Sequence, residues 1–159
     1  MDKIEKAGYM RKAIHFAYNG SRAFRGGPFG ACLVKNGIVI ASGANTVLRG
    51  DPTAHAEINA IRAAAKVLKT HDLSGCVIFS TTEPCPMCFA AIHWAKIRRV
   101  YYGTSIGDAA KLGFNELPIS NARMKKIGRS PVVISGGFLR DECRKLLDDW
   151  RDIPGVMVY

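Results

Sequence analysis

Two cysteines have the spacing of a metal-binding or redox-active pair. Cys85 and Cys88 lie in the segment Glu-Pro-Cys-Pro-Met-Cys at residues 83–88, where proline opens an expected helix. Residues three apart share one face of a helix, so both sulfur atoms can reach the same ion. The N-terminus of a helix also favours the thiolate form that binds zinc. Alone, the motif is compatible with a catalytic metal site, a redox pair or a structural zinc knuckle.

A histidine and a glutamate earlier in the chain favour the catalytic metal site. His55 and Glu57 form a His-x-Glu motif, and this motif followed by Pro-Cys-x-x-Cys is the known signature of zinc nucleobase deaminases. One neutral imidazole and two thiolates balance the charge of Zn²⁺ and leave one tetrahedral position open for water, whose pKa then falls to about 7. Glu57 is two residues from His55 and points elsewhere, so it can move protons instead of binding the ion. We predict one Zn²⁺ per chain, held by His55, Cys85 and Cys88, with Glu57 as the catalytic acid and base.

The surrounding sequence predicts alternating helices and strands that would position these motifs. Apolar spacing and turn residues predict helices at 3–18, 51–68, 85–95 and 139–150 and strands at 31–35, 38–42, 76–81, 99–102 and 131–134. Asn36-Gly37 predicts a hairpin between the first two strands, and Asp51-Pro52 is expected to begin the second helix. Residues 76–102 form a βαβ unit with parallel strands. Residues 152–159 are expected to be a loose end. The pattern predicts a three-layer α/β/α fold with a central mixed sheet of about five strands.

Composition indicates one soluble domain spanning residues 1–159. A chain of 159 residues can bury one core. It has no apolar run of membrane-spanning length, and the segment 1–6 lacks the apolar stretch of a secretory signal, so we expect a cytoplasmic protein without a membrane partner. Five cysteines, an odd number, argue against a disulfide framework. The net charge of +10 would suit a polyanion such as tRNA, but the basic residues are scattered, which favours a solvated basic surface.

Several segments resemble the cytidine deaminase superfamily and, within it, the small purine-base deaminases. The segments that carry the resemblance are 27–31, 51–57, 83–88, 91–95 and 108–114. The last two look like those of bacterial guanine deaminases, whereas residues 132–147 are more similar to tRNA adenosine deaminases. The resemblance implies the same zinc ligands and the same proton shuttle, and it implies a homodimer.

The resemblance also implies a set of substrate contacts. Asn45 would hydrogen-bond the base, Phe29 and Trp94 would line the pocket, and Tyr159 would close it. Glu116 falls on the acidic residue that contacts guanine, where guanine deaminases carry paired aspartates and this chain has Asn115-Glu116. Without the resemblance, Phe29 and Trp94 fit core packing, Asn45 fits a loop cap and Tyr159 fits a frayed terminus.

The leading functional hypothesis is hydrolytic deamination of a free nucleobase, guanine to xanthine plus ammonia. The second hypothesis is a tRNA-specific adenosine deaminase that produces inosine, and another free base such as cytosine is a third. A non-catalytic zinc module that binds nucleic acid belongs to a different class. It would need a fourth protein ligand, and the sequence offers none at suitable spacing.

Overall fold

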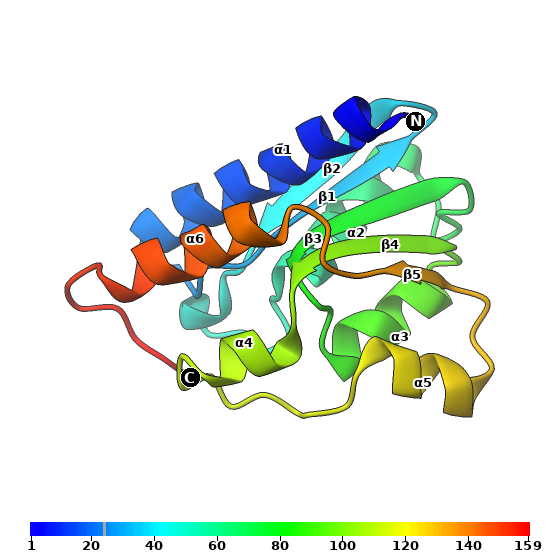
Figure 1. Cartoon of the computed structure of the whole chain (residues 1–159). Helices are drawn as coiled ribbons and strands as arrows, with labels where there is room; N and C mark the ends of the chain where they lie inside the picture. The colour runs from blue at the N-terminus through cyan, green and yellow to red at the C-terminus, as the bar shows by residue number, and fades with distance from the viewer. Residues whose placement is uncertain (24) are drawn as a thin grey trace.

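Five strands form one mixed sheet between two layers of helices (Figure 1). The structure is a computed structural model that describes residues 1–23 and 25–159. Its strands are β1 (Gly30–Lys35), β2 (Ile38–Ala44), β3 (Cys76–Thr82), β4 (Arg99–Thr104) and β5 (Val133–Ser135). Its helices are α1 (Lys3–Arg22), α2 (Ala56–Leu68), α3 (Pro86–Trp94), α4 (Ile106–Ala110), α5 (Asn121–Gly128) and α6 (Arg140–Arg151), with a short 3-10 helix at Val47–Arg49.

The sheet has the order β2-β1-β3-β4-β5. β1 is antiparallel to both of its neighbours, whereas β3, β4 and β5 run parallel. Asn36 and Gly37 join β1 to β2 with φ values of 50° and 78°, the left-handed pair that two-residue hairpins favour. The predicted hairpin and the predicted parallel βαβ unit are both confirmed.

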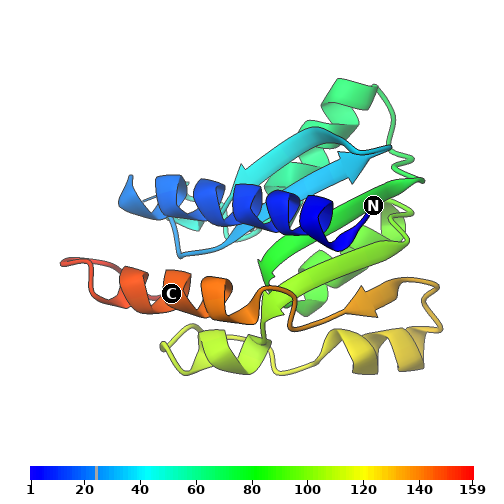
Figure 2. The ribbon, with the colours of Figure 1, turned by 45° about the horizontal axis from the view of Figure 1, so that its top comes forward.

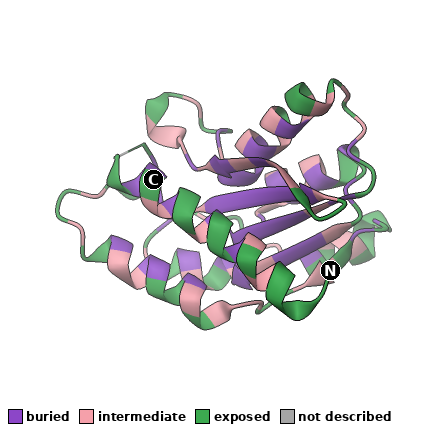
Figure 3. Cartoon of the chain, turned by 90° about the horizontal axis from the view of Figure 1, so that it is seen from above, coloured by how far each residue is buried: buried purple, intermediate pink, exposed green. Residues whose placement is uncertain are grey.

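Helices cover both faces of the sheet. α1 and α6 lie side by side on one face, and α2 and α3 lie on the other (Figure 2). Alternate residues of the strands enter two separate cores. Leu33 packs in the cluster that contains α2 and α3 residues, whereas its neighbour Cys32 packs in the cluster that contains α1 and α6 residues. Figure 3 shows the central strands buried between helices whose outer surfaces are exposed. The predicted α/β/α architecture is confirmed.

The start of α2 differs from the prediction. The helix was expected to begin at Asp51-Pro52, but it begins at Ala56, with His55 as its N-cap. The Asp51 carboxylate accepts hydrogen bonds from the backbone N–H and the hydroxyl of Thr53, at 2.8 and 2.6 Å. This local turn uses the oxygen that would otherwise cap a helix. The helix start therefore moves to the histidine itself.

Two short helices, α4 and α5, were not expected. Each begins after a serine whose hydroxyl accepts a backbone N–H three residues later: Ser105 accepts from Asp108, and Ser120 accepts from Arg123. The Asp108 carboxylate in turn accepts a hydrogen bond from the backbone N–H of Ser105, which completes a capping box. These capping signals are visible in the sequence, but the two helices have only five and eight residues. Within the described residues, no helix is long and apolar enough to cross a membrane.

One glycine of β2 lets α2 approach the sheet closely. A Cβ atom added at Gly43 would lie 2.5 Å from the Ala56 carbonyl oxygen and 2.7 Å from the Ala60 nitrogen. We therefore expect Gly43→Ala to displace the first turns of α2 and to cost about 1–3 kcal/mol of unfolding free energy. Thermal and urea unfolding measure the loss. Gly8→Ala is the matched control, because a Cβ on Gly8 in α1 meets no atom within 4 Å and alanine is the better helix former. Equal stability of the two variants would contradict the prediction.

Candidate active site

The starts of two helices on the same face of the sheet meet at the end of β3. His55 is the N-cap of α2, and Cys85 is the N-cap of α3. Cys88 lies in the first turn of α3 and is fully buried. An N-cap residue has extended backbone geometry, so its side chain projects from the start of the helix. The three predicted metal ligands therefore converge from two elements that are distant in sequence.

The donor atoms of this cluster suit a tetrahedral metal ion. The nitrogen and the two sulfur atoms all lie within 4.8 Å of one another, and Cys85 Sγ is 3.5 Å from His55 Nδ1. Two ligands at zinc bond lengths of about 2.0 Å (N) and about 2.3 Å (S) are separated by about 3.5 Å when the angle between them is tetrahedral. The His/Cys/Cys cluster therefore fits a zinc-type ion with one position left for a non-protein ligand.

The surroundings favour the thiolate of Cys85. The pKa of Cys85 is lowered to about 4, chiefly by a hydrogen bond from the Cys88 thiol and also by the contact with His55, against the opposing effect of burial. A thiolate is the form of cysteine that coordinates a metal. The surroundings of Cys85 thus favour the form of the side chain that a cation would need.

Glu57 lies beside the cluster on the first turn of α2. Its side chain is 6% exposed, and the Ser80 hydroxyl from β3 donates a hydrogen bond to Oε1 at 2.7 Å. Burial raises the pKa of Glu57, and the charge on Cys85 raises it further. A raised pKa makes the carboxyl group easier to protonate, which suits a group that accepts a proton and then releases it. The position and the environment fit the predicted proton shuttle.

A pocket of about 520 Å³, including its open mouth, joins these groups. It is lined by Phe29, Asn45, His55, Glu57, Thr82, Glu83, Cys85, Phe114, Asn115, Glu116 and Tyr159. Phe29 and Phe114 meet edge to face with ring centroids 4.9 Å apart, and Phe114 meets Tyr159 in the same way at 5.3 Å. Aromatic walls and a few polar groups are typical of a site for a flat heterocycle.

The C-terminal residue forms part of this pocket. The Tyr159 hydroxyl donates a hydrogen bond to Asn45 Oδ1 at 2.6 Å and accepts one from the Gly27 N–H at 3.0 Å. Its carbonyl oxygen accepts the Asn115 N–H at 3.1 Å. The expectation that residues 152–159 form a loose end is therefore wrong, because polar contacts hold Tyr159 to three separate parts of the chain.

Asn45 contributes an amide to the pocket and Glu116 contributes a carboxyl group. Asn45 Oδ1 also accepts the Val47 N–H at 3.1 Å, so this residue does cap a loop. The bonds from Tyr159 and Val47 both go to the Asn45 oxygen. The amide nitrogen takes part in neither of them within the described residues, so it can donate to a ligand. Glu116 lines the pocket, and burial raises its pKa to about 7, with a further contribution from the charge on Cys85. The pocket thus offers an amide and a carboxyl group near the cluster.

The structure does not bring Trp94 to this pocket. Trp94 is the last residue of α3 and is 79% exposed. It lines a separate surface hollow together with Ser74, Lys96 and Pro131. Nine residues separate it from Cys85, which places it about 13 Å away along the helix. The expectation that Trp94 lines the pocket is not met within one chain.

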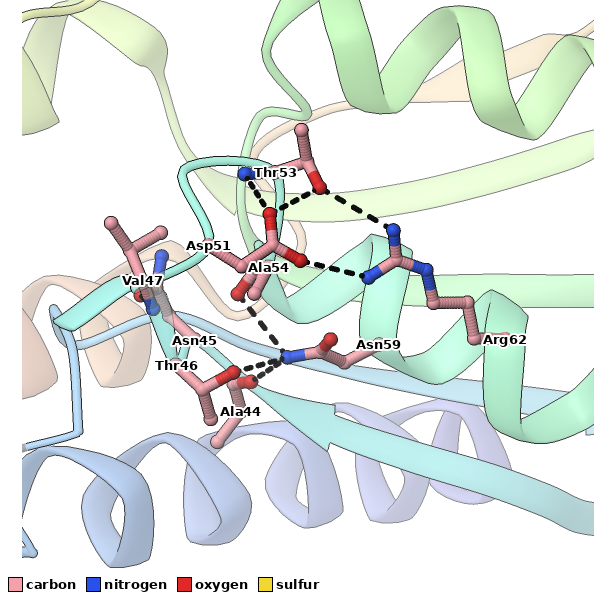
Figure 4. A network of polar contacts seen from close by, with 9 residues as sticks. All are labelled: Ala44, Asn45, Thr46, Val47, Asp51, Thr53, Ala54, Asn59 and Arg62. Atoms are coloured by element: carbon pink, nitrogen blue, oxygen red, sulfur yellow. Dashed lines mark hydrogen bonds and ion pairs between the residues drawn. The ribbon is translucent and has the colours of Figure 1, made fainter. Parts of the chain in front are cut away.

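Sequence reasoning missed several residues of the site. The pocket is also lined by Thr82, Glu83, Phe114 and Asn115. Two of these, Glu83 and Phe114, lie inside the motif segments, but the sequence analysis assigned them no role. Asn59 was missed altogether. It follows His55 by one helical turn, and its side chain holds the loop that leads to His55 (Figure 4). Its position on the first turn after a metal ligand was the available signal.

The loop at residues 45–54 is held by a network of polar contacts from α2. Asn59 Nδ2 donates to the Ala44 carbonyl at 2.8 Å, to the Thr46 hydroxyl at 2.9 Å and, more weakly, to the Ala54 carbonyl at 3.2 Å. Arg62 reaches Asp51 at 3.4 Å on the outer side of the same loop. Figure 4 shows the two side chains extending from α2 toward opposite parts of the loop. The loop carries Asn45 at one end and leads to His55 at the other.

A His/Cys/Cys cluster that fits a metal ion, an adjacent buried carboxyl group and aromatic walls are the features expected of a metal-dependent hydrolase that acts on flat heterocycles. Comparison with known families is consistent with this class. The family model of the cytidine and deoxycytidylate deaminase zinc-binding region matches residues 3–104, and the chain belongs to this family. It is a hydrolase that acts on C–N bonds of cyclic amidines.

Relatives of known activity cover most of the chain. Guanine deaminase of Bacillus subtilis is 47% identical over 109 residues, which are 68% of this chain and 70% of that protein; its crystal structure superposes with a TM-score of 0.67 over 69% of this chain and 71% of that one. A guanine deaminase from Nitrosomonas europaea superposes with a TM-score of 0.82 at 31% identity, over 91% and 84% of the two chains. The tRNA-specific adenosine deaminase of Buchnera aphidicola subsp. Schizaphis graminum is 33% identical over 147 residues, 89% of this chain and 91% of that protein.

The Asn59 network predicts a contribution of the loop at residues 45–54 to the stability of the folded chain. We expect Asn59→Ala to lower the unfolding free energy by about 1–3 kcal/mol, because the partly buried Ala44 carbonyl and Thr46 hydroxyl lose a donor. Urea unfolding measures this loss. Asn19→Ala is the matched control, since Asn19 also lies on a helix but is exposed and bonds only to His15 in the described residues. A loss no larger than that of the control would show that the network does not stabilise the loop.

Proposed function

We propose that the protein deaminates free guanine to xanthine and ammonia, with one Zn²⁺ held by His55, Cys85 and Cys88. The observation that carries the proposal is the single pocket that joins the His/Cys/Cys cluster and Glu57 to Asn45 and Glu116. Guanine has acceptors at O6 and N7 and donors on its ring N–H and exocyclic amine. An amide donor and a carboxyl group complement these edges. Two relatives that cover most of the chain are guanine deaminases.

Glu57 performs the proton transfers of the proposed reaction. When bound, the zinc ion supplies Lewis-acid activation of a water molecule. Glu57 accepts a proton from that water as the water oxygen bonds to the amine-bearing carbon, and it delivers this proton to the adjacent ring nitrogen. It then takes the second proton from the oxygen that has been added and delivers it to the amine, so that the C–N bond breaks and guanine and water yield xanthine and ammonia. The hydrogen bond from Ser80 to Oε1 holds the carboxyl group in place.

The aromatic residues orient the base and limit what can enter. Phe29 and Phe114 provide rings against which a purine can pack. Tyr159, through its bonds to Asn45 and Gly27, narrows the entrance on the side of the C-terminus. A free base fits this arrangement better than a nucleotide within an RNA chain.

Editing of adenosine in a tRNA is the second candidate function. Two observations favour it: the net charge of +10, and the similarity to a tRNA-specific adenosine deaminase over 89% of the chain. The contacts of Tyr159 argue against it, because an anticodon loop would have to displace the C-terminal residue.

We also propose that the protein acts as a cytoplasmic homodimer in purine metabolism. A second copy would cover the exposed apolar side chains Trp94 and Ile127, which are 79% and 71% exposed on α3 and α5. α3 and α5 are in contact with each other.

A substrate panel tests the proposed function. We expect release of ammonia from guanine, with xanthine as product, and at least tenfold lower kcat/KM for guanosine, adenine and cytosine, because the pocket is narrowed and its polar groups match guanine. An enzymatic ammonia assay with chromatographic product identification measures this. Turnover of cytosine or adenine without guanine would remove the substrate assignment. Inosine in a tRNA substrate, with binding that weakens steeply as salt rises, would support the second candidate.

Replacing Glu57 should separate metal binding from catalysis. We expect Glu57→Gln to retain about one zinc per chain and to lower kcat by about 10²–10⁴-fold, because the amide cannot carry the protons. Cys88→Ala should lose most of the zinc, because only two ligands remain. Metal analysis and steady-state kinetics measure both effects. Glu142→Gln, at an exposed pair with Arg11, is the control for a change from glutamate to glutamine. Full activity of Glu57→Gln would rule out the assigned role.

A further inference from the structure

Glu83 is a buried carboxylate that bonds to the starts of two helices. The residue follows β3 and precedes α3 in the chain, and it is 8% exposed. Oε1 accepts the backbone N–H of Asn121 at 2.9 Å, and Oε2 accepts that of Ile106 at a longer 3.4 Å. These are the first residues of α5 and α4. The serine caps bond to N–H groups two residues further on, so Glu83 provides acceptors for N–H groups that the caps leave free.

The two bonded residues enclose the part of the chain that carries the recognition groups. Phe114, Asn115 and Glu116 all lie between Ile106 and Asn121, and all three line the pocket. A single side chain therefore holds both ends of this segment, residues 106–121. Its middle is held separately, by the bond from the Asn115 N–H to the Tyr159 carbonyl.

Glu83 is itself tied to the metal cluster and to the sheet. It precedes Cys85 by two residues, and its backbone N–H donates to the Thr104 carbonyl at the end of β4 at 2.8 Å. The Asn121 side chain donates to the carbonyl of Pro84 at 2.5 Å, which adds a second link from α5 to the same short stretch. The peptide that presents the cysteine ligands and the segment that presents Glu116 therefore share one anchoring point.

We propose that Glu83 is a positioning residue that fixes segment 106–121 against the metal cluster and thereby sets the affinity for the substrate. It acts through Phe114 and Glu116 and has no assigned part in the proton transfers. The kinetic consequence rests on the proposed function, whereas the structural consequence does not. Both oxygens must accept a hydrogen bond, so the role requires a carboxylate: an amide has only one acceptor and would direct its NH₂ group at a backbone N–H.

Hydrogen exchange on the zinc-loaded protein tests the structural part. In Glu83→Gln we expect peptides that cover residues 106–121 to exchange about tenfold faster or more, because about 1.4 kcal/mol of lost local stability is a tenfold change. Peptides of α1 and α2 should be unchanged, and the zinc content should stay near one per chain. Glu142→Gln, at an exposed pair with Arg11, changes no bond to segment 106–121 among the described residues and should leave the exchange of that segment at the level of the unmodified protein.

A second variant keeps the test decisive if Glu83→Gln folds poorly. Glu83→Asp retains two acceptor oxygens on a side chain that is one methylene shorter, so it can reach one helix start but not both. We expect its segment 106–121 to exchange faster than in the unmodified protein and more slowly than in Glu83→Gln. Unchanged exchange of this segment in whichever of the two variants folds would overturn the proposal.

Kinetics separate positioning from a general loss of structure. We expect Glu83→Gln to raise KM for guanine about tenfold while kcat changes less than about threefold, since substrate affinity is lost and the proton transfers are kept. The double variant with Glu83→Gln and Glu116→Gln should raise KM by less than the product of the two single increases, because Glu83 acts through Glu116. A lowered melting temperature with unchanged KM would overturn the role in affinity. Faster exchange in a protein that turns over no guanine would refute the proposed function while the positioning role stands.

Discussion

The site depends on the close approach of two helix N-termini on one face of the sheet. His55 and Cys85 occupy the N-caps of α2 and α3, and their side chains are 3.5 Å apart. Both helices reach this position by packing small and aromatic side chains, Ala56 and Phe89 among them, into one core. The positive ends of the helices favour the thiolate that a cation needs. Displacement of either helix would therefore change the packing, the ligand geometry and the charge state together.

Features that depend on local spacing could be predicted from the sequence. The hairpin at Asn36-Gly37 and the parallel βαβ unit follow from turn chemistry and element order. The pairing of Cys85 with Cys88 follows from helical periodicity, whereas the addition of His55, 30 residues earlier, came from a known signature and not from local spacing. The start of α2 could not be predicted in this way, since Asp51 and Pro52 carry helix-start signals that a local turn uses instead. α4 and α5 were missed because they are short, and their first N–H groups bond to Glu83, a residue distant in sequence.

The candidate site also has a part that could be predicted from the sequence and a part that could not. The chemistry of the cluster is readable from residue types, because zinc sites demand particular donors at particular spacings. The walls of the pocket come from six separate parts of the chain, and no spacing rule connects Phe29, Phe114 and Tyr159. Resemblance to a family supplied Phe29, Glu116 and Tyr159 correctly as neighbours, whereas Trp94 lies on the outer surface at the far end of α3.

Under the proposed function, the position of Tyr159 and recognition of the base would be coupled through Asn45. An isolated asparagine amide can turn either its oxygen or its nitrogen toward a ligand. Here the oxygen is held by two donors, the Tyr159 hydroxyl and the Val47 N–H, so the nitrogen is the group left to face the pocket. If Tyr159 withdrew, one of these two donors would be lost and the amide orientation would be less strongly determined. In the proposed reaction, Tyr159 would act on selectivity in two ways, by narrowing the entrance and by presenting Asn45 as a hydrogen-bond donor. The net charge of +10 can attract an anion to the surface, but it carries no information about the ring, which this local geometry would select under the proposed function.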